Sequence, residues 1–222
     1  YFDNANEHRL WRRNEFQNVE IALVRNAFWC EDPCNPWDMR WQAGVRFFRF
    51  EESLLFGSRA HAGAWGADTA NEAYIDEKIT NYLVGFQFGG EAGYDLGYNL
   101  RAYVAPKIGI YNNHIKNDFA IYRADGTAAQ INPASGMGAH GYPVHSTKDV
   151  LSFLTEIDLG LQWHFAQRWS ASVGYRVAVA TGIGLADHQI PFYLVDVPEI
   201  ADIDHNGELI LHGGYAGLEY NF

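Results

Sequence analysis

The chain has 222 residues, of which 48% are hydrophobic, 15% aromatic and 19% charged, and its formal net charge is −11. This hydrophobic share excludes a disordered chain, and 16 Lys and Arg against 27 Asp and Glu argue against nucleic-acid binding, which needs a basic face. Two cysteines exclude a disulfide-dense miniprotein.

Aromatic residues are abundant in a chain that is polar on average. The sequence holds 7 Trp, 13 Tyr and 14 Phe, although its mean hydropathy is −0.24. No run of eighteen consecutive apolar residues is present, so a transmembrane helix is excluded. A β-barrel escapes that test because its strands alternate between apolar and polar residues.

Alternation with a period of two predicts strands along most of the chain. In chain order, the alternating stretches are 18–25, 39–47, 81–91, 100–111, 151–164, 171–180 and 210–222. No comparable amphipathic helical stripe is present. Most of these stretches exceed the length of an average soluble strand, about 5–6 residues, and suit tilted strands crossing about 25 Å of hydrocarbon. We therefore expect an all-β protein, an antiparallel transmembrane up-and-down β-barrel of at least eight strands, in one domain over residues 1–222.

The connections between these stretches alternate in length. Short connections lie at 29–38, 92–97 and 165–168, and long polar ones at about 57–78, 112–148 and 182–207. Short periplasmic turns and long extracellular loops produce this pattern in barrels.

Aromatic side chains gather at strand ends beside the short connections, as in the aromatic girdle of a membrane barrel. The girdle candidates are Trp37, Trp41, Trp163, Trp169, Tyr220 and Phe222.

Charged residues occupy the polar positions of the strands, and a charge that faced lipid would be costly. We therefore expect the lumen to be lined by Arg46, Arg101, Lys107, Glu156, Asp158, Arg176 and Glu219. In a barrel of about eight strands these side chains would interlock as a salt-bridged plug, and in one of about twelve or more they would line a water-filled pore. The function is accordingly a porin-like channel for small solutes or a structural membrane protein. A soluble lipocalin-like barrel with an apolar ligand is the rival interpretation.

Several segments resemble a known family. The stretches FQNVEIALVR (16–25), QAGVRFFRFEE (42–52), NYLVGFQFGG (81–90) and LRAYVAPK (100–107) are similar to porin-like outer-membrane β-barrel proteins typical of planctomycetes. The final GLEYNF (217–222) resembles the terminal signal read by the barrel assembly machinery. The resemblance implies location in a bacterial outer membrane, with outer-membrane lipid and that machinery as partners. It leaves open whether the protein forms homo- or hetero-oligomers.

The odd number of predicted strands raises the question of an additional strand in the N-terminal region. Single-chain bacterial barrels have an even number of strands with both termini in the periplasm. Seven stretches therefore leave one strand to be found before residue 16. Residues 1–14 could supply it, or the chain could lack N-terminal strands.

Two short motifs suggest local sites. Cys30 and Cys34 share one turn, and a disulfide between them is expected in an oxidising periplasm. Asp202, Asp204 and Asn206 follow the first half of a calcium loop, but the twelfth position is Gly213 instead of Glu. An Asn-Gly hairpin turn is the other interpretation of this segment. No other cofactor is suggested by the sequence.

Catalysis is not expected. His145 and Ser146 with Asp149 could be imagined as a hydrolytic triad, but such residues meet by chance in polar loops.

Overall fold

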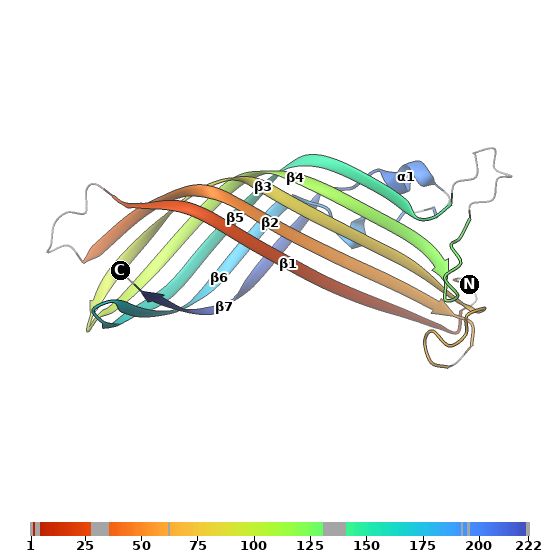
Figure 1. Ribbon diagram of the computed structural model, residues 1–222, viewed down its shortest axis with the longest axis horizontal. Helices are drawn as coiled ribbons and strands as arrows, with labels where there is room; N and C mark the ends of the chain where they lie inside the picture. The colour runs from red at the N-terminus through yellow and green to blue at the C-terminus, as the bar shows by residue number, and fades with distance from the viewer. Residues whose placement is uncertain are drawn as a thin grey trace.

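The protein is an all-β chain in which strands follow one another as neighbours. The computed structural model describes Phe2 and residues 5–27, 36–61, 63–130, 141–191, 193–194 and 196–220. Seven antiparallel strands form one sheet in chain order (Figure 1), which confirms the up-and-down prediction. They are β1 (Glu7–Asn26), β2 (Trp37–Arg59), β3 (Glu72–Gly97), β4 (Leu100–Arg123), β5 (Val144–Ala166), β6 (Trp169–Ile183) and β7 (Gly207–Tyr220).

Two short helical elements lie between β6 and β7. They are the 3₁₀ turn η2 (Ala186–His188) and the helix α1 (Val197–Ala201). No helix in the part of the chain that the structure describes is long and apolar enough to cross a membrane.

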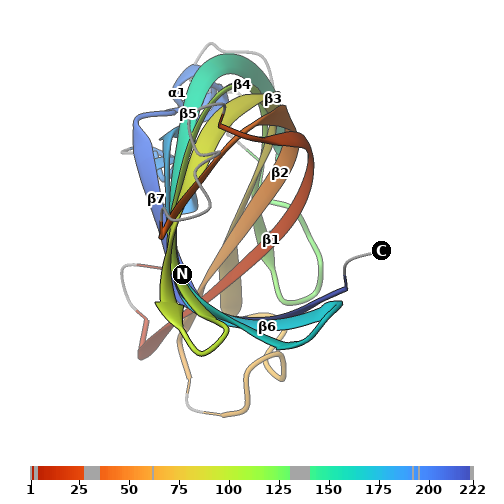
Figure 2. The same cartoon turned by 90° about the vertical axis from the view of Figure 1, so that its left-hand side faces the viewer.

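The sheet curls into a half-barrel. Seen from one end it forms an arch with β1 and β7 on opposite sides (Figure 2). Within the described ranges β1 pairs with β2 alone and β7 with β6 alone, so an eighth strand and barrel closure stay predictions. The possibility of a separate strand within residues 1–14 is wrong, because residues 7–14 are the first part of β1.

The strands are longer than predicted, and the connections are correspondingly shorter. Residues 92–97 belong to β3, and the turn to β4 is Tyr98–Asn99, whose φ angles of 55° and 62° are those of a tight two-residue hairpin. The long connections are reduced to 60–71, 124–143 and 184–206. They lie at the end opposite the short turns, as the right-hand side of Figure 1 shows.

The extra length escaped prediction because the apolar residues change face partway along the long strands β2, β3 and β4. On β3, Val84, Phe86 and Phe88 are exposed, whereas Ile79 and Leu83 are fully buried. Apolar residues therefore occupy even positions in one half of β3 and odd positions in the other. A search for one continuous apolar face stops at this change, although the backbone continues as a strand.

In the half beside the short turns, the convex face is apolar and exposed. Its exposed side chains include Val45, Val84, Phe86, Phe88, Ile108, Ile110, Leu151, Phe153, Ile157, Leu159 and Val173. On β2 this apolar band runs from Trp37 to Phe47. A strand of that length rises roughly 36 Å and crosses about 25 Å when tilted by about 45°. The band thus fits the hydrocarbon layer expected for an outer-membrane barrel.

In the other half, which we call the outer half, the apolar side chains lie on the concave face and are buried. Phe48, Phe50, Leu83 and Tyr111 begin this core. The connection 184–206 packs onto it through three buried side chains, Ala186, Ile203 and Ile200. The concave face of the outer half is therefore covered by a segment of the same chain.

Sharp curling brings neighbouring strands so close that a side chain would not fit at some positions. A Cβ atom added to Gly85 would lie 2.1 Å from the carbonyl oxygen of Ile110, and one added to Gly44 would lie 2.2 Å from that of Ile21. Backbone atoms cannot rotate away as a side chain can, so glycine is required at these two bends.

We predict that Gly85→Ala destabilises the folded protein by about 2 kcal/mol, because relief of the clash requires a backbone shift. Urea unfolding in detergent micelles measures this. Gly213→Ala is the matched control, since a Cβ there has open space around it. Equal stability of the two variants would contradict the close approach at Gly85.

Candidate functional site

The concave face beside the apolar band carries ion pairs that cross the interior. Arg46 on β2 donates from Nη2 to Oε2 of Glu156 on β5 at 2.8 Å. Lys107 on β4 places Nζ 3.2 Å from Glu156 Oε1 and 3.2 Å from Glu20 Oε2 on β1. Because β2 and β5 are not sheet neighbours, such contacts require the two strands to face each other across the concave side.

Glu156 is the centre of this network. Its side chain is fully buried, and Nε of Arg176 lies 3.3 Å from its Oε1. Arg176 also donates to both carboxylate oxygens of Asp158, at 2.6 and 2.7 Å. Glu156 and Asp158 are thus each paired with at least one cation, as a buried charge requires.

Two tyrosines make a further contact across the interior. The hydroxyl groups of Tyr103 on β4 and Tyr215 on β7 are 2.6 Å apart. Their rings lie against Gly160 and Gly174, where a Cβ would come within 2.6 Å and 2.5 Å of ring atoms. Small residues on β5 and β6 therefore leave the space that these rings fill.

A second ionic group lies nearer the short turns. Arg101 donates from Nη2 to Asp38 at 2.8 Å and lies 2.7 Å from Glu91, while Gln162 donates to Glu219 at 2.9 Å. The seven predicted lumen residues all lie on the concave face, in these two groups. That position is compatible with a lumen lining, and the lining itself stays a prediction.

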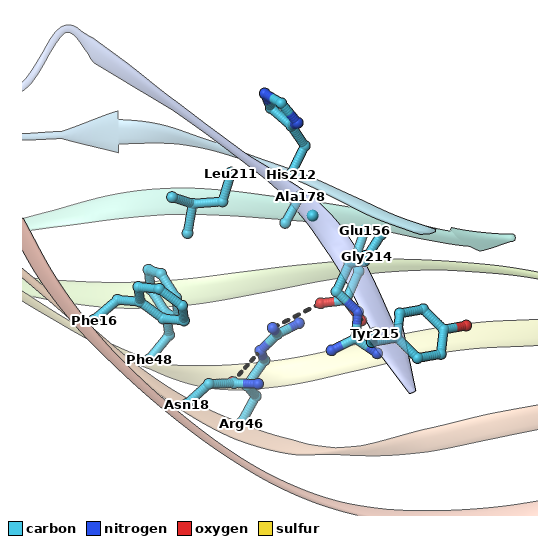
Figure 3. Close-up of a pocket in the computed structure, with 12 residues that line it drawn as sticks. Phe16, Asn18, Arg46, Phe48, Glu156, Ala178, Leu211, His212, Gly214 and Tyr215 are labelled. Carbon is cyan, nitrogen blue, oxygen red and sulfur yellow. Dashed lines mark hydrogen bonds and ion pairs between the residues drawn. The ribbon is translucent and has the colours of Figure 1, made fainter. Parts of the chain in front are cut away.

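A cavity of about 460 Å³ lies among these strands. Phe16 and Phe48 stack with ring centroids 6.4 Å apart on one side, and Arg46, Glu156 and Tyr215 lie on the other (Figure 3). A neighbouring cavity of about 260 Å³ is lined mainly by polar side chains, among them Arg101 and Asp158. The interior therefore offers space bordered by charges of both signs.

The girdle candidates that the structure describes share the end with the short turns. Trp37 packs edge-on against Tyr94 with centroids 5.0 Å apart, and Trp169 lies 4.9 Å from Tyr220. Trp163, which is 54% exposed, lies near the end of the same apolar band on β5, where Phe165 follows it, and Trp41 lies within it on β2. Phe222 lies outside the described residues, as do Cys30 and Cys34 of the predicted disulfide.

The calcium candidates lie at the end of the 184–206 connection. Asp202 pairs with Lys148 at 3.1 Å, and Oδ1 of Asp204 accepts the backbone N–H of Asn206 at 2.9 Å. The described ranges contain no group of three His, Cys, Asp or Glu side chains that could hold a metal ion. Calcium binding stays a prediction.

The imagined triad is not assembled. His145 contacts Asp118 on β4, and Asp149 contacts His114 at 3.0 Å. The hydrogen bond from His114 lowers the pKa of Asp149. Since side chains alternate between faces, Ser146 points to the face opposite from His145.

One family model matches this chain. The model described as "Putative beta barrel porin-7" (BBP7) covers residues 12–200. The chain belongs to this family. The match confirms the resemblance to porin-like β-barrel proteins. It begins within β1 and includes β2 to β6 together with most of the 184–206 connection. No curated protein matches the chain.

Sequence reasoning missed the polar residues that hold the 184–206 connection. Asn81 bonds both the carbonyl and the N–H of Gly184, at 2.8 and 2.9 Å, and Glu52 accepts the N–H of Ala186 at 2.9 Å. Both side chains are fully buried. Their only signal in the sequence is that they share a face with buried apolar residues of β2 and β3.

Glu77 is a second buried acid of the outer half, beyond the apolar band. Both of its carboxylate oxygens are buried without a hydrogen-bond partner. Burial raises its pKa from 4.5 to about 9, so the carboxyl group is neutral in the folded protein at pH 7. As a neutral acid it can donate a hydrogen bond to Oδ1 of the adjacent Asn117, which is also buried without a partner.

We predict that Glu156→Gln destabilises the protein by about 3 kcal/mol, because it leaves buried cations without their shared carboxylate. Urea unfolding in micelles measures the loss. Glu219→Gln, at an exposed position of the same face, should lose much less. The double variant Arg46→Met with Glu156→Leu should recover part of the stability lost in Glu156→Gln. If it recovers none, the loss is not caused by an unpaired charge.

We predict that Glu77→Gln makes the protein more stable at neutral and alkaline pH. In the native protein Glu77 keeps its proton up to about pH 9, whereas the same group in the unfolded chain loses its proton near pH 4.5. The stability of the wild type therefore falls as the pH rises from about 4.5 to about 9. Unfolding at about pH 5, 7 and 9 should show a gap between variant and wild type that widens with pH. A gap that is independent of pH would contradict a neutral Glu77.

Proposed function

We propose that this protein is an integral protein of the bacterial outer membrane and acts as a porin-like channel for small solutes. The observation that carries the proposal is the opposite character of the two faces beside the short turns. The convex face is apolar and exposed, whereas the concave face holds the ion pairs of Arg46, Lys107 and Glu156. The convex face can therefore lie against lipid, and the concave face can lie against water.

A lipocalin-like binding module would require the reverse arrangement, with an apolar interior open to a ligand. Among the residues that the structure describes, the apolar core of the concave face lies in the outer half, where the 184–206 connection already packs on it. The geometry therefore favours the membrane protein. Its family supports a role other than catalysis.

The interior is narrow in both halves. Side chains from β2 and β5 meet across the concave face, and in the outer half the connection fills it. These features support passage of small solutes only. Complete filling would instead make the protein a structural component of the membrane, which is the second function that the same observations favour.

The pattern of residues on β7 supports a proposal about a protein partner. On β7, Ile210 and Leu218 lie on the exposed apolar face, at alternate positions with Leu211 and Glu219 on the other face. We propose that the barrel assembly machinery recognises this strand together with the residues up to Phe222.

We predict discrete conductance steps when refolded protein is added to a planar lipid bilayer. Arg176→Gln should change the ratio of cation to anion permeability, because it removes one cation from the concave network and leaves Glu156 its other partners. Arg13→Gln is the control, since that side chain is 78% exposed and lies outside this network.

Flotation with lipid vesicles distinguishes a channel from a structural membrane protein, and both from a protein that does not insert into a membrane. Protein that floats with vesicles yet gives no conductance steps would support the structural role over the channel. Protein that stays monodisperse without detergent or lipid would contradict membrane integration itself.

A further inference from the structure

Cationic side chains meet on the convex face where the apolar band ends. Arg49 on β2 lies opposite Tyr82 on β3, and Lys116 on β4 lies opposite Thr80, one step further along the same face. The next convex residues toward the short turns are Phe47 and Val84. The three side chains thus stand at the boundary between the apolar band and the charged part of the outer half.

Tyr82 lies between the two cations. The guanidinium carbon of Arg49 is 5.8 Å from the centre of its ring, and Nζ of Lys116 is 5.5 Å from it. Cation–π contacts at this distance hold both charges close to one ring. A tyrosine at such a boundary is typical of a membrane–water interface.

One carboxylate near this ring is shared by two cations. Arg49 and Lys78 both pair with Glu51, which also accepts from the hydroxyl of Thr80. Lys116 is not among the partners of Glu51 in the described ranges.

The carboxylates nearest to Lys116 along the β4–β5 ladder are engaged elsewhere. Asp149 contacts His114, and Asp118 contacts His145, on the two neighbouring pairs of the same face. In the described ranges, no carboxylate lies within ion-pair distance of Lys116. Its ammonium group is thus placed to bind an external anion.

The surface next to these cations suits acyl chains. Val84 is 58% exposed, Ile110 is 56% exposed and Phe86 is 76% exposed, and all three belong to the apolar band. A molecule that covers both parts of this surface needs apolar chains and an anionic group at one end. Arginine and lysine bind phosphate well because their N–H donors reach its charged oxygens.

We propose that Arg49, Tyr82 and Lys116 bind the phosphate-bearing headgroup of an outer-leaflet lipid, whose acyl chains lie on the apolar band. The inference rests on the proposed membrane location and goes beyond it, because it assigns one anionic lipid site to named residues. It does not depend on whether the barrel conducts.

The test uses full-length protein inserted in phosphatidylcholine vesicles that contain lipid A or dephosphorylated lipid A. Lipid A should raise the thermal midpoint of unfolding, and dephosphorylated lipid A or inorganic phosphate should not. The double variant Arg49→Gln with Lys116→Gln should need about tenfold more lipid A for the same shift, as expected when charge-assisted contacts are lost.

Arg13→Gln is the matched control, because it removes one exposed cation from the same face further from the apolar band. It should respond to lipid A like the wild type. An equal shift from dephosphorylated lipid A, an unchanged response of the double variant or an equal loss in Arg13→Gln would overturn the site. These outcomes are read on protein that has floated with vesicles, so failure of the site is distinct from failure of membrane insertion.

Discussion

The structure depends on one geometric constraint, the alternation of side chains between the two faces of a continuous sheet. Apolar residues occupy the convex face up to Phe47 and Val84, and the concave face from Phe48 and Leu83 onward. Since the backbone does not break at this change, one set of strands builds two environments. The first half can face lipid, and the second half can hold a core that stands clear of the membrane.

The two halves fill their interiors by different means. Beside the apolar band, the interior is crossed by ion pairs from opposite walls, with the buried Glu156 at their centre. In the outer half it is filled by the 184–206 connection, which Asn81 and Glu52 hold through backbone hydrogen bonds. Charged side chains could leave room for water between them, whereas a packed segment of chain does not.

The sequence predicted those parts of the molecule that depend on neighbouring positions. Alternation placed Arg46 and Glu156 on the face opposite the apolar residues, because a charge is costly in lipid. It began β3 too late and ended β4 too early, since their apolar residues change face near Leu83 and Tyr111. The contacts of Asn81 with Gly184 join positions far apart in the chain, and no local pattern reports such a pair.

The two-residue turn at Tyr98–Asn99 also has a consequence for the order of folding. It closes the β3–β4 hairpin with a loop of two residues, as small as the 167–168 loop between β5 and β6, so these two pairings carry the lowest entropic cost of loop closure in the described sheet. The contact between Arg46 and Glu156 joins residues 110 positions apart and requires the strands between them to be in register. Pairing should therefore begin at the β3–β4 and β5–β6 hairpins and spread outward, and the ion pairs of the interior should form last.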